Sequence, residues 1–219
     1  ECPVLEPVAS EKLFYTPLLR FRLPDHEALD QALLAEGERL RGDSPGVHKS
    51  NRGGWHSEGN LFDQPAEPIQ TLRRAAILSV MEATRSVSSK VDPDSLDMKL
   101  FAWMNMNPTG GFNAPHTHPG AHWSGVYYVR QPKVDSGNSG MIEFLDPRSD
   151  LPAWRILQSR AFRPKRKIRP EAGEIVLFPS YLVHWVYPNE TGGERVTIAF
   201  NAMLKRAQGS ETEATEDDD

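Results

Sequence analysis

Residues 113–129 have the sequence NAPHTHPGAHWSGVYYV, and we expect the rest of the chain to be built around them. It holds three of the seven histidines and continues into a segment of β-branched and aromatic residues. His116 and His118 are two positions apart, so on an extended strand both imidazoles project from the same face. Each imidazole can bind a metal ion at ~2.0 to 2.1 Å. The pair therefore predicts two ligands of one metal site.

A third ligand is predicted on a later strand. Residues 173–188, GEIVLFPSYLVHWVYP, place His184 near the middle of a second strand-like run. A histidine pair at one strand end and a lone histidine on a later strand can hold a metal on three facial ligands and leave positions open. His122 could replace His118, orient a ligand or act on substrate, and Glu143 or Asp146 could complete the set instead. The spacing favours His118.

Two further segments alternate polar and apolar residues, as strands with one face toward a pocket do. In residues 96–107, Asn105 shares a face with Trp103 and Asn107, and buried asparagines need polar partners. In residues 195–201 the polar face carries Arg195 and Thr197. Tyr128 faces the same site if its strand keeps register with the histidines. We therefore expect Asn105, Tyr128, Arg195 and Thr197 to line the pocket.

Residues 188–193, PNETGG, predict a turn that joins the strand of His184 to the strand of Arg195 as a hairpin. With Pro188 opposite Arg195, His184 would lie opposite Ala199, and Arg195 would lie roughly 13 Å farther along the strands. A dicarboxylate bound to the metal at one end could reach the arginine, which can grip the distal carboxylate with two hydrogen bonds.

The order of the elements predicts an α+β fold. A helix is expected from about Asp25, as its cap, to Arg41, and another over residues 68–89, while residues 96–204 continue as seven or eight strands. Helices followed by strands indicate a double-stranded β-helix, a cupin-like jelly-roll barrel with the helices outside. We expect one domain of residues 1–209, with its helical part at about 24–90.

Several motifs together resemble the 2-oxoglutarate- and Fe(II)-dependent oxygenases. They are HTHP at residues 116–119, SGVYYV at 124–129, the run 173–184 that ends in His184, and ERVTIAFN at 194–201. The likeness covers about residues 98–204, and SNRGGW at residues 50–55 resembles the N-terminal part of that family. One position departs from the usual pattern, because His118 stands where a carboxylate is expected.

The resemblance implies a reaction and its cofactors. His116, His118 and His184 would hold Fe(II), and the far carboxylate of 2-oxoglutarate would meet Arg195 and Thr197. With O₂ the enzyme would form succinate and CO₂ and hydroxylate an unactivated C–H bond of a small-molecule or peptide substrate. Halogenation, desaturation and ring formation begin from the same chemistry and stay open.

Two alternatives to this function remain at the level of the sequence. Gly110 and the His116-x-His118 pair match the start of a cupin motif, although no glutamate follows at the required spacing, so a cupin-type metalloenzyme without 2-oxoglutarate is one alternative. The other is a jelly-roll protein that binds a metal or a small molecule without catalysis. A structural zinc site would need a fourth protein ligand.

The amino-acid composition indicates which binding partners and which cellular compartment to expect. The net charge is -5, but six of the 30 acidic residues lie in the last nine positions, so the rest nearly balances 25 Lys and Arg. Because positive and negative charges nearly cancel outside the tail, we expect the chain to bind neither nucleic acid nor membranes. The acidic tail, residues 210–219, is expected to be disordered. A single cysteine and no long apolar run predict a cytoplasmic protein, and a homo-oligomer is compatible with the sequence.

Two polar stretches each carry two interpretations. Residues 42–60 are long for a connector, so Trp55 and His56 could line a substrate entrance, or Trp55 could pin the loop to the core. Residues 160–169 hold six basic residues, which suit either a solvated sheet edge or a surface for an anionic partner.

Overall fold

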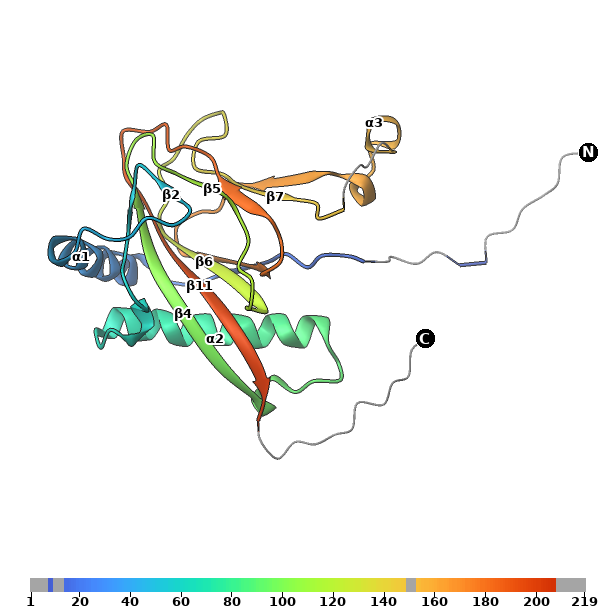
Figure 1. The fold of residues 1–219 in the computed structure, drawn as a ribbon, viewed down its shortest axis with the longest axis horizontal. Helices are drawn as coiled ribbons and strands as arrows, with labels where there is room; N and C mark the ends of the chain where they lie inside the picture. Colours follow the sequence, from blue (N-terminus) through green and yellow to red (C-terminus); the bar gives the residue numbers. More distant parts are fainter. Residues whose placement is uncertain (1–7, 10–13, 149–152, 208–219) are drawn as a thin grey trace, which may run out of the picture.

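The structure is a computed structural model of the 219-residue chain, and it describes residues 8–9, 14–148 and 153–207. The predicted tail of residues 210–219 lies outside these ranges. Two antiparallel sheets and two long helices make up most of the described chain (Figure 1). Within these ranges, none of the helices combines the length and apolar composition that a membrane crossing requires.

Eleven strands in the described ranges form the two sheets. The major sheet has the order β1 (Leu19–Arg22), β9 (Glu174–Pro179), β6 (Trp123–Arg130), β11 (Arg195–Arg206), β4 (Leu96–Asn107) and β3 (Trp55–His56). The minor sheet has the order β2 (Asn51–Arg52), β5 (Phe112–His116), β10 (His184–Val186), β7 (Ile142–Leu145) and β8 (Lys165–Ile168). From β4 to β11 the chain passes repeatedly from one sheet to the other, with β7 and β8 as the one consecutive pair in the same sheet, which confirms the predicted double-stranded β-helix.

The two long helices, α1 (Glu27–Asp43) and α2 (Glu67–Val87), pack on the outer face of the major sheet (Figure 1). A short α3 (Ala153–Leu157) and 3₁₀ turns at Leu61–Asp63, Pro93–Ser95 and Arg160–Phe162 complete the described helices. Leu33 of α1 and Leu72 of α2 are fully buried in one cluster with Met104 and Phe200 of the sheet. The helices therefore lie outside the barrel, as predicted.

The start of α1 differs from the expectation. Asp25 has a φ of 49°, and the helix begins at Glu27 after His26, so Asp25 is not its cap. Side-chain contacts instead organise the first turn. The His26 Nδ1 atom lies 2.6 Å from Asp30 Oδ2, and the Tyr127 hydroxyl of β6 donates to Asp30 Oδ1 at 2.6 Å. These contacts tie the first turn to the major sheet.

The long strands place alternate residues on opposite faces, as their sequences predict. On β4, Met104 and Met106 pack against the helices, while Asn105 faces the space between the sheets. On β11, Ile198 and Phe200 join the same outer core, while Arg195 faces inward. A second apolar cluster lies between the sheets and fills the barrel beside the polar site; it comprises Tyr128, Ile142, Phe144, Ile168, Val176, Phe178, Leu182 and Val186.

The predicted hairpin between His184 and Arg195 is wrong. In the described chain β10 pairs with β5 and β7, whereas β11 pairs with β4 and β6, so the two strands belong to different sheets. Asn189 explains the path of the turn. Its N–H donates to the Gly111 carbonyl, and its carbonyl accepts from the Gly110 N–H. These bonds tie the turn to the β4–β5 connection, and the chain crosses to the major sheet.

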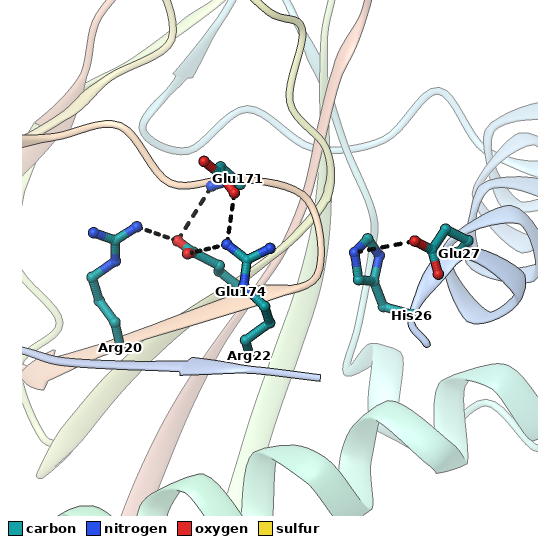
Figure 2. A network of polar contacts seen from close by, with 6 residues as sticks. All are labelled: Arg20, Arg22, His26, Glu27, Glu171 and Glu174. Carbon is teal, nitrogen blue, oxygen red and sulfur yellow. Dashed lines mark hydrogen bonds and ion pairs between the residues drawn. The ribbon is translucent and has the colours of Figure 1, made fainter. Parts of the chain in front are cut away.

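Ion pairs attach the N-terminal strand to the major sheet (Figure 2). Arg20 and Arg22 of β1 both contact the carboxylate of Glu174 on β9, whose side chain is 8% exposed. Arg22 also reaches Glu171 at 2.6 Å. At the far edge of the minor sheet lies β8, so part of the basic run forms an edge strand, as one of its two interpretations predicts.

Candidate metal centre and pocket

The barrel brings three histidines together between the sheets. His116 ends β5, His118 follows it by two residues, and His184 begins β10. The three side chains can each offer one ligand atom, and these atoms lie within 4.8 Å of one another. His116 and His184 occupy paired positions of neighbouring strands, with ring centroids 4.4 Å apart. The cluster can therefore hold one metal ion on three nitrogens.

Backbone carbonyls select the tautomer of two of these rings. The Nδ1 atom of His116 lies 2.7 Å from the Ala114 oxygen, and the Nδ1 atom of His184 lies 2.9 Å from the Leu182 oxygen. Because a carbonyl oxygen only accepts hydrogen bonds, each Nδ1 must donate. The proton on Nδ1 leaves the Nε2 lone pair available to a metal.

Burial keeps the three imidazoles neutral. It lowers the pKa of His184 to about 3, with a smaller contribution from the neighbouring His116. Burial likewise lowers the pKa of His118 to about 4, again with a contribution from His116. The pKa of His116 is also lowered by burial. Metal binding requires deprotonated nitrogens, so the cluster is ready to coordinate at neutral pH.

The other candidate ligands are engaged elsewhere. His122 Nδ1 accepts a hydrogen bond from the Leu204 N–H. Glu143 accepts from Trp185 Nε1 and the Tyr187 hydroxyl, and because it alternates with the inward residues of β7, it lies on the outer face of the minor sheet. Asp146 pairs with Arg148 at 2.7 Å. Among the residues that the structure describes, the metal-binding group contains the three histidines alone.

Arg195 lines the same cavity from the opposite sheet. Its side chain is nearly fully buried, with 2% exposure, and it makes no ion pair within the described part of the chain. Its Nε donates to Gln131 Oε1 at 3.0 Å, and its guanidinium carbon lies 5.3 Å from the centre of the Tyr128 ring. Burial lowers the pKa of Arg195, as expected for a cation removed from water.

The remaining predicted pocket residues also reach this cavity. Asn105 and Thr197 lie on paired positions of β4 and β11, and Tyr128 of β6 pairs with Thr197 from the other side. All three line the cavity with Arg195 and the histidines. Asn105 Oδ1 and the Tyr128 hydroxyl are buried and have no hydrogen-bond partner within the described part of the chain. The cavity itself is narrow, about 30 Å³ in volume.

Comparison with known proteins finds one family match within the barrel. Residues 101–201, which include all three histidines and Arg195, match the profile of the 2OG-Fe(II) oxygenases. The match covers 101 of the 219 residues, and it marks this segment as similar to that family. No curated protein sequence matches the chain.

Solved structures share the fold of this chain. A prolyl-4-hydroxylase from Pseudomonas putida is 18% identical with a TM-score of 0.61, over 90% of this chain and 96% of that one. HygX from Streptomyces hygroscopicus, solved with nickel and 2-oxoglutarate, is 14% identical with a TM-score of 0.58, over 90% and 87% of the chains. A prolyl hydroxylase from Trichoplax adhaerens, in complex with a peptide fragment, is 12% identical with a TM-score of 0.58, over 85% and 83%.

One contact of this site could not be predicted from the sequence, and the roles of two other residues were left open. Gln131 holds Arg195, but it follows β6 with no local signal that it turns toward the cavity. Trp55 pins the loop of residues 42–60, because its Nε1 donates to the Ser44 carbonyl at 3.0 Å. His56 lines a second cavity beside the histidines. Trp55 therefore agrees with the second interpretation of that loop, and a role of His56 at a substrate entrance stays a prediction.

Proposed function

We propose that this chain is an Fe(II)- and 2-oxoglutarate-dependent oxygenase that hydroxylates an unactivated C–H bond. The observation that carries the proposal is Arg195, a buried arginine that has no counter-ion among the described residues and lines the same cavity as three convergent histidines. In this proposal residues 1–209 form one domain and residues 210–219 are a tail. Cys2 is the only cysteine, which supports a reducing compartment such as the cytoplasm.

A buried guanidinium without a carboxylate partner favours an anionic ligand. Removing a cation from water costs several kcal/mol unless an anion or good hydrogen bonds compensate it. Gln131 and the Tyr128 ring contact Arg195 but carry no negative charge. A carboxylate can accept two parallel hydrogen bonds from a guanidinium, which is the strongest neutralising contact available to it. The distal carboxylate of 2-oxoglutarate fits this requirement.

Two buried polar atoms support a ligand with several oxygen atoms. Buried polar side-chain atoms nearly always have a hydrogen-bond partner, so each exception needs an explanation. The Tyr128 hydroxyl can donate to a carboxylate, and the Asn105 amide can serve a hydroxyl or water beside it. Because the cavity is narrow, we expect its side chains to move apart when 2-oxoglutarate enters.

The chain's residues divide into two groups in this proposal. His116, His118 and His184 hold Fe(II), and Arg195 and Thr197 bind the far carboxylate of 2-oxoglutarate, with Tyr128 and Asn105 beside it. The bound iron supplies the redox chemistry with O₂. In the balanced reaction, substrate R–H, O₂ and 2-oxoglutarate give R–OH, succinate and CO₂. The buried apolar cluster of the barrel keeps bulk water away from the ligands.

The substrate is proposed to be a small molecule or a peptide. Among the structural neighbours, the Trichoplax prolyl hydroxylase was solved with a peptide fragment, and HygX was solved with hygromycin B. Those ligands belong to those proteins, and they indicate the two kinds of molecule to test here. A purely structural zinc site fits less well, because such sites use four protein ligands and the described cluster has three.

The first experiment is the anaerobic addition of 2-oxoglutarate to the Fe(II)-loaded protein. A new visible metal-to-ligand charge-transfer band is expected, because the oxoacid would chelate the iron. Succinate, which lacks the 2-oxo group, is the matched control and should give no band. A loaded protein that binds Fe(II) but gives no band with 2-oxoglutarate would contradict the proposal and favour a cupin-type or non-catalytic protein.

A further inference from the structure

A second cavity, of about 380 Å³, lies beside the histidine cluster. It shares His116 and His118 with the narrow cavity, so a molecule bound there lies next to the metal position. Its other walls come from the loop before β2, from β3 and β4, and from β11. A volume of this size lies within the ~300 to 1,000 Å³ that is usual for small-ligand pockets.

Rings line the path from the surface to the metal ligands. Phe101 of β4 is 41% exposed, and its ring centroid lies 6.2 Å from that of Trp103. Trp103 in turn lies 5.4 Å from His118. His56 stacks on Trp103 at 5.7 Å with an interplanar angle of 7°, which holds the indole in place. A flat apolar group can bury these faces by stacking on them.

The charged side chain at this cavity is positive. Lys49 lies at its edge, neither aspartate nor glutamate lines it, and Lys49 makes no ion pair among the described residues. Asn201 adds a donor: its Oδ1 accepts from the Ser124 hydroxyl at 2.8 Å, so its amide N–H groups are the part left to face a ligand. An ammonium group would meet repulsion here, whereas a carboxylate would meet a cation and a donor.

The ligand set of the proposed metal adds to this preference. Three neutral histidines leave both charges of a divalent ion uncompensated by the protein, whereas a carboxylate ligand would cancel one of them. Bound 2-oxoglutarate brings two negative charges, one at the metal and one at Arg195, so one charge of the metal and the charge of Lys49 remain. The pocket beside the cluster therefore stays electropositive after the co-substrate binds.

We infer that this cavity binds a carboxylic acid that carries a flat apolar group, with the ring on Trp103 and Phe101 and the carboxylate toward Lys49. The inference rests on the proposed function, because it takes the cavity as the site of the substrate that is oxidised. Lys49 and Trp103 determine specificity in it. Lys49 favours a ligand with a negative charge, and Trp103 favours a ligand with a flat ring.

The test uses three probes that share a ring and a chain but differ in charge: 3-phenylpropanoate, 3-phenylpropan-1-ol and 3-phenylpropylammonium. Affinities are measured by titration calorimetry on the full chain loaded with Mn(II) and 2-oxoglutarate. We expect the acid to bind about 5-fold tighter than the alcohol, and the ammonium to bind weakest. Paramagnetic relaxation of the acid's ring protons by Mn(II) should place the ring near the metal.

Matched variants test the charge preference of Lys49 separately from the stacking on Trp103. Lys49→Met should remove the difference between acid and alcohol, and Lys49→Glu should reverse the order of acid and ammonium. Lys90→Glu makes the same charge change outside both cavities and should keep the wild-type order. Trp103→Leu should weaken all three probes by roughly 3- to 10-fold, while Trp103→Phe, which keeps a ring, should weaken them less.

The outcomes distinguish this inference from the function on which it rests. Binding of 2-oxoglutarate is measured in the same cell before each probe. Failure to bind 2-oxoglutarate would contradict the proposed function. If 2-oxoglutarate binds but the acid shows no advantage, if no probe binds, or if Lys49→Glu keeps the wild-type order, the carboxylic-acid inference alone is overturned.

Discussion

His116 and His184 face each other directly across two neighbouring strands of the minor sheet, and each donates from Nδ1 to the carbonyl two residues before it. The same local bond thus orients both rings, and their Nε2 atoms turn toward one point. Because backbone atoms make these bonds, the orientation exists before any metal arrives. Ligands held in this way bind a metal with less loss of side-chain entropy.

The first prediction concerns the metal. His184→Ala removes one of three ligands and should abolish stoichiometric Fe(II) binding, measured by calorimetry under anaerobic conditions. His122→Ala is the matched control, because His122 lies close in sequence to the cluster but bonds to Leu204 instead. Full Fe(II) occupancy in His184→Ala would contradict the three-histidine site.

The second prediction concerns the co-substrate. Arg195→Ala should raise the 2-oxoglutarate concentration required for the charge-transfer band by ~10- to 1,000-fold, since a buried charge-assisted contact is lost. Fe(II) binding should be unchanged, because Arg195 belongs to the other sheet. Arg130→Ala, at the exposed end of β6, is the control. An unchanged 2-oxoglutarate requirement in Arg195→Ala would place the carboxylate elsewhere.

The third prediction concerns pH in the absence of metal. The pKa values of His184, about 3, and His118, about 4, lie below the ordinary ~6.5. As pH falls below about 6.5, the unfolded chain takes up protons on these residues and the folded chain does not. The free energy of unfolding should therefore decrease between about pH 6.5 and pH 4. Urea titrations with a chelator present should show this slope, and His184→Gln should flatten it. Equal slopes in both proteins would refute the prediction.

The fourth prediction concerns the packing of the major sheet. A Cβ at Gly125 would overlap the ring of Phe200, its buried partner on β11. Gly125→Ala should therefore lower the free energy of unfolding by about 1–3 kcal/mol, measured by urea titration. Gly192→Ala is the control, because its Cβ would enter open space. Adding Phe200→Leu to Gly125→Ala should recover part of the loss. If Gly125→Ala leaves the free energy of unfolding unchanged, the Phe200 ring can move aside and the prediction is wrong.

Local patterns in the sequence predicted most of the barrel. The alternation in residues 96–107 depends only on which face of a strand is buried, and β4 has those bounds and those faces. The same reasoning placed Arg195 and Thr197 on the inner face of β11. The histidine pair and the later His184 converge because each is placed by its own strand. Their role as iron ligands stays a prediction.

The partners of those strands could not be predicted in the same way. Residues 188–193 have the composition of a hairpin turn, yet hydrogen bonds between Asn189 and the distant Gly110 and Gly111 send the chain to the other sheet. The cavity next to Trp103 could not be predicted from the sequence either. It depends on the pairing of β3 with β4, about 50 residues apart, and on the position of Lys49 beside that pair.

The crossing of the chain between β10 and β11 places the three histidines with the minor sheet and Arg195 on the major one. A dicarboxylate held at both ends would act as a noncovalent cross-link between the two sheets. Its binding energy would then oppose their separation, so saturation with metal and 2-oxoglutarate should slow hydrogen exchange in β10 and β11 together. In Arg195→Ala the metal alone would protect one half of the barrel, and the two sheets would exchange as separate units.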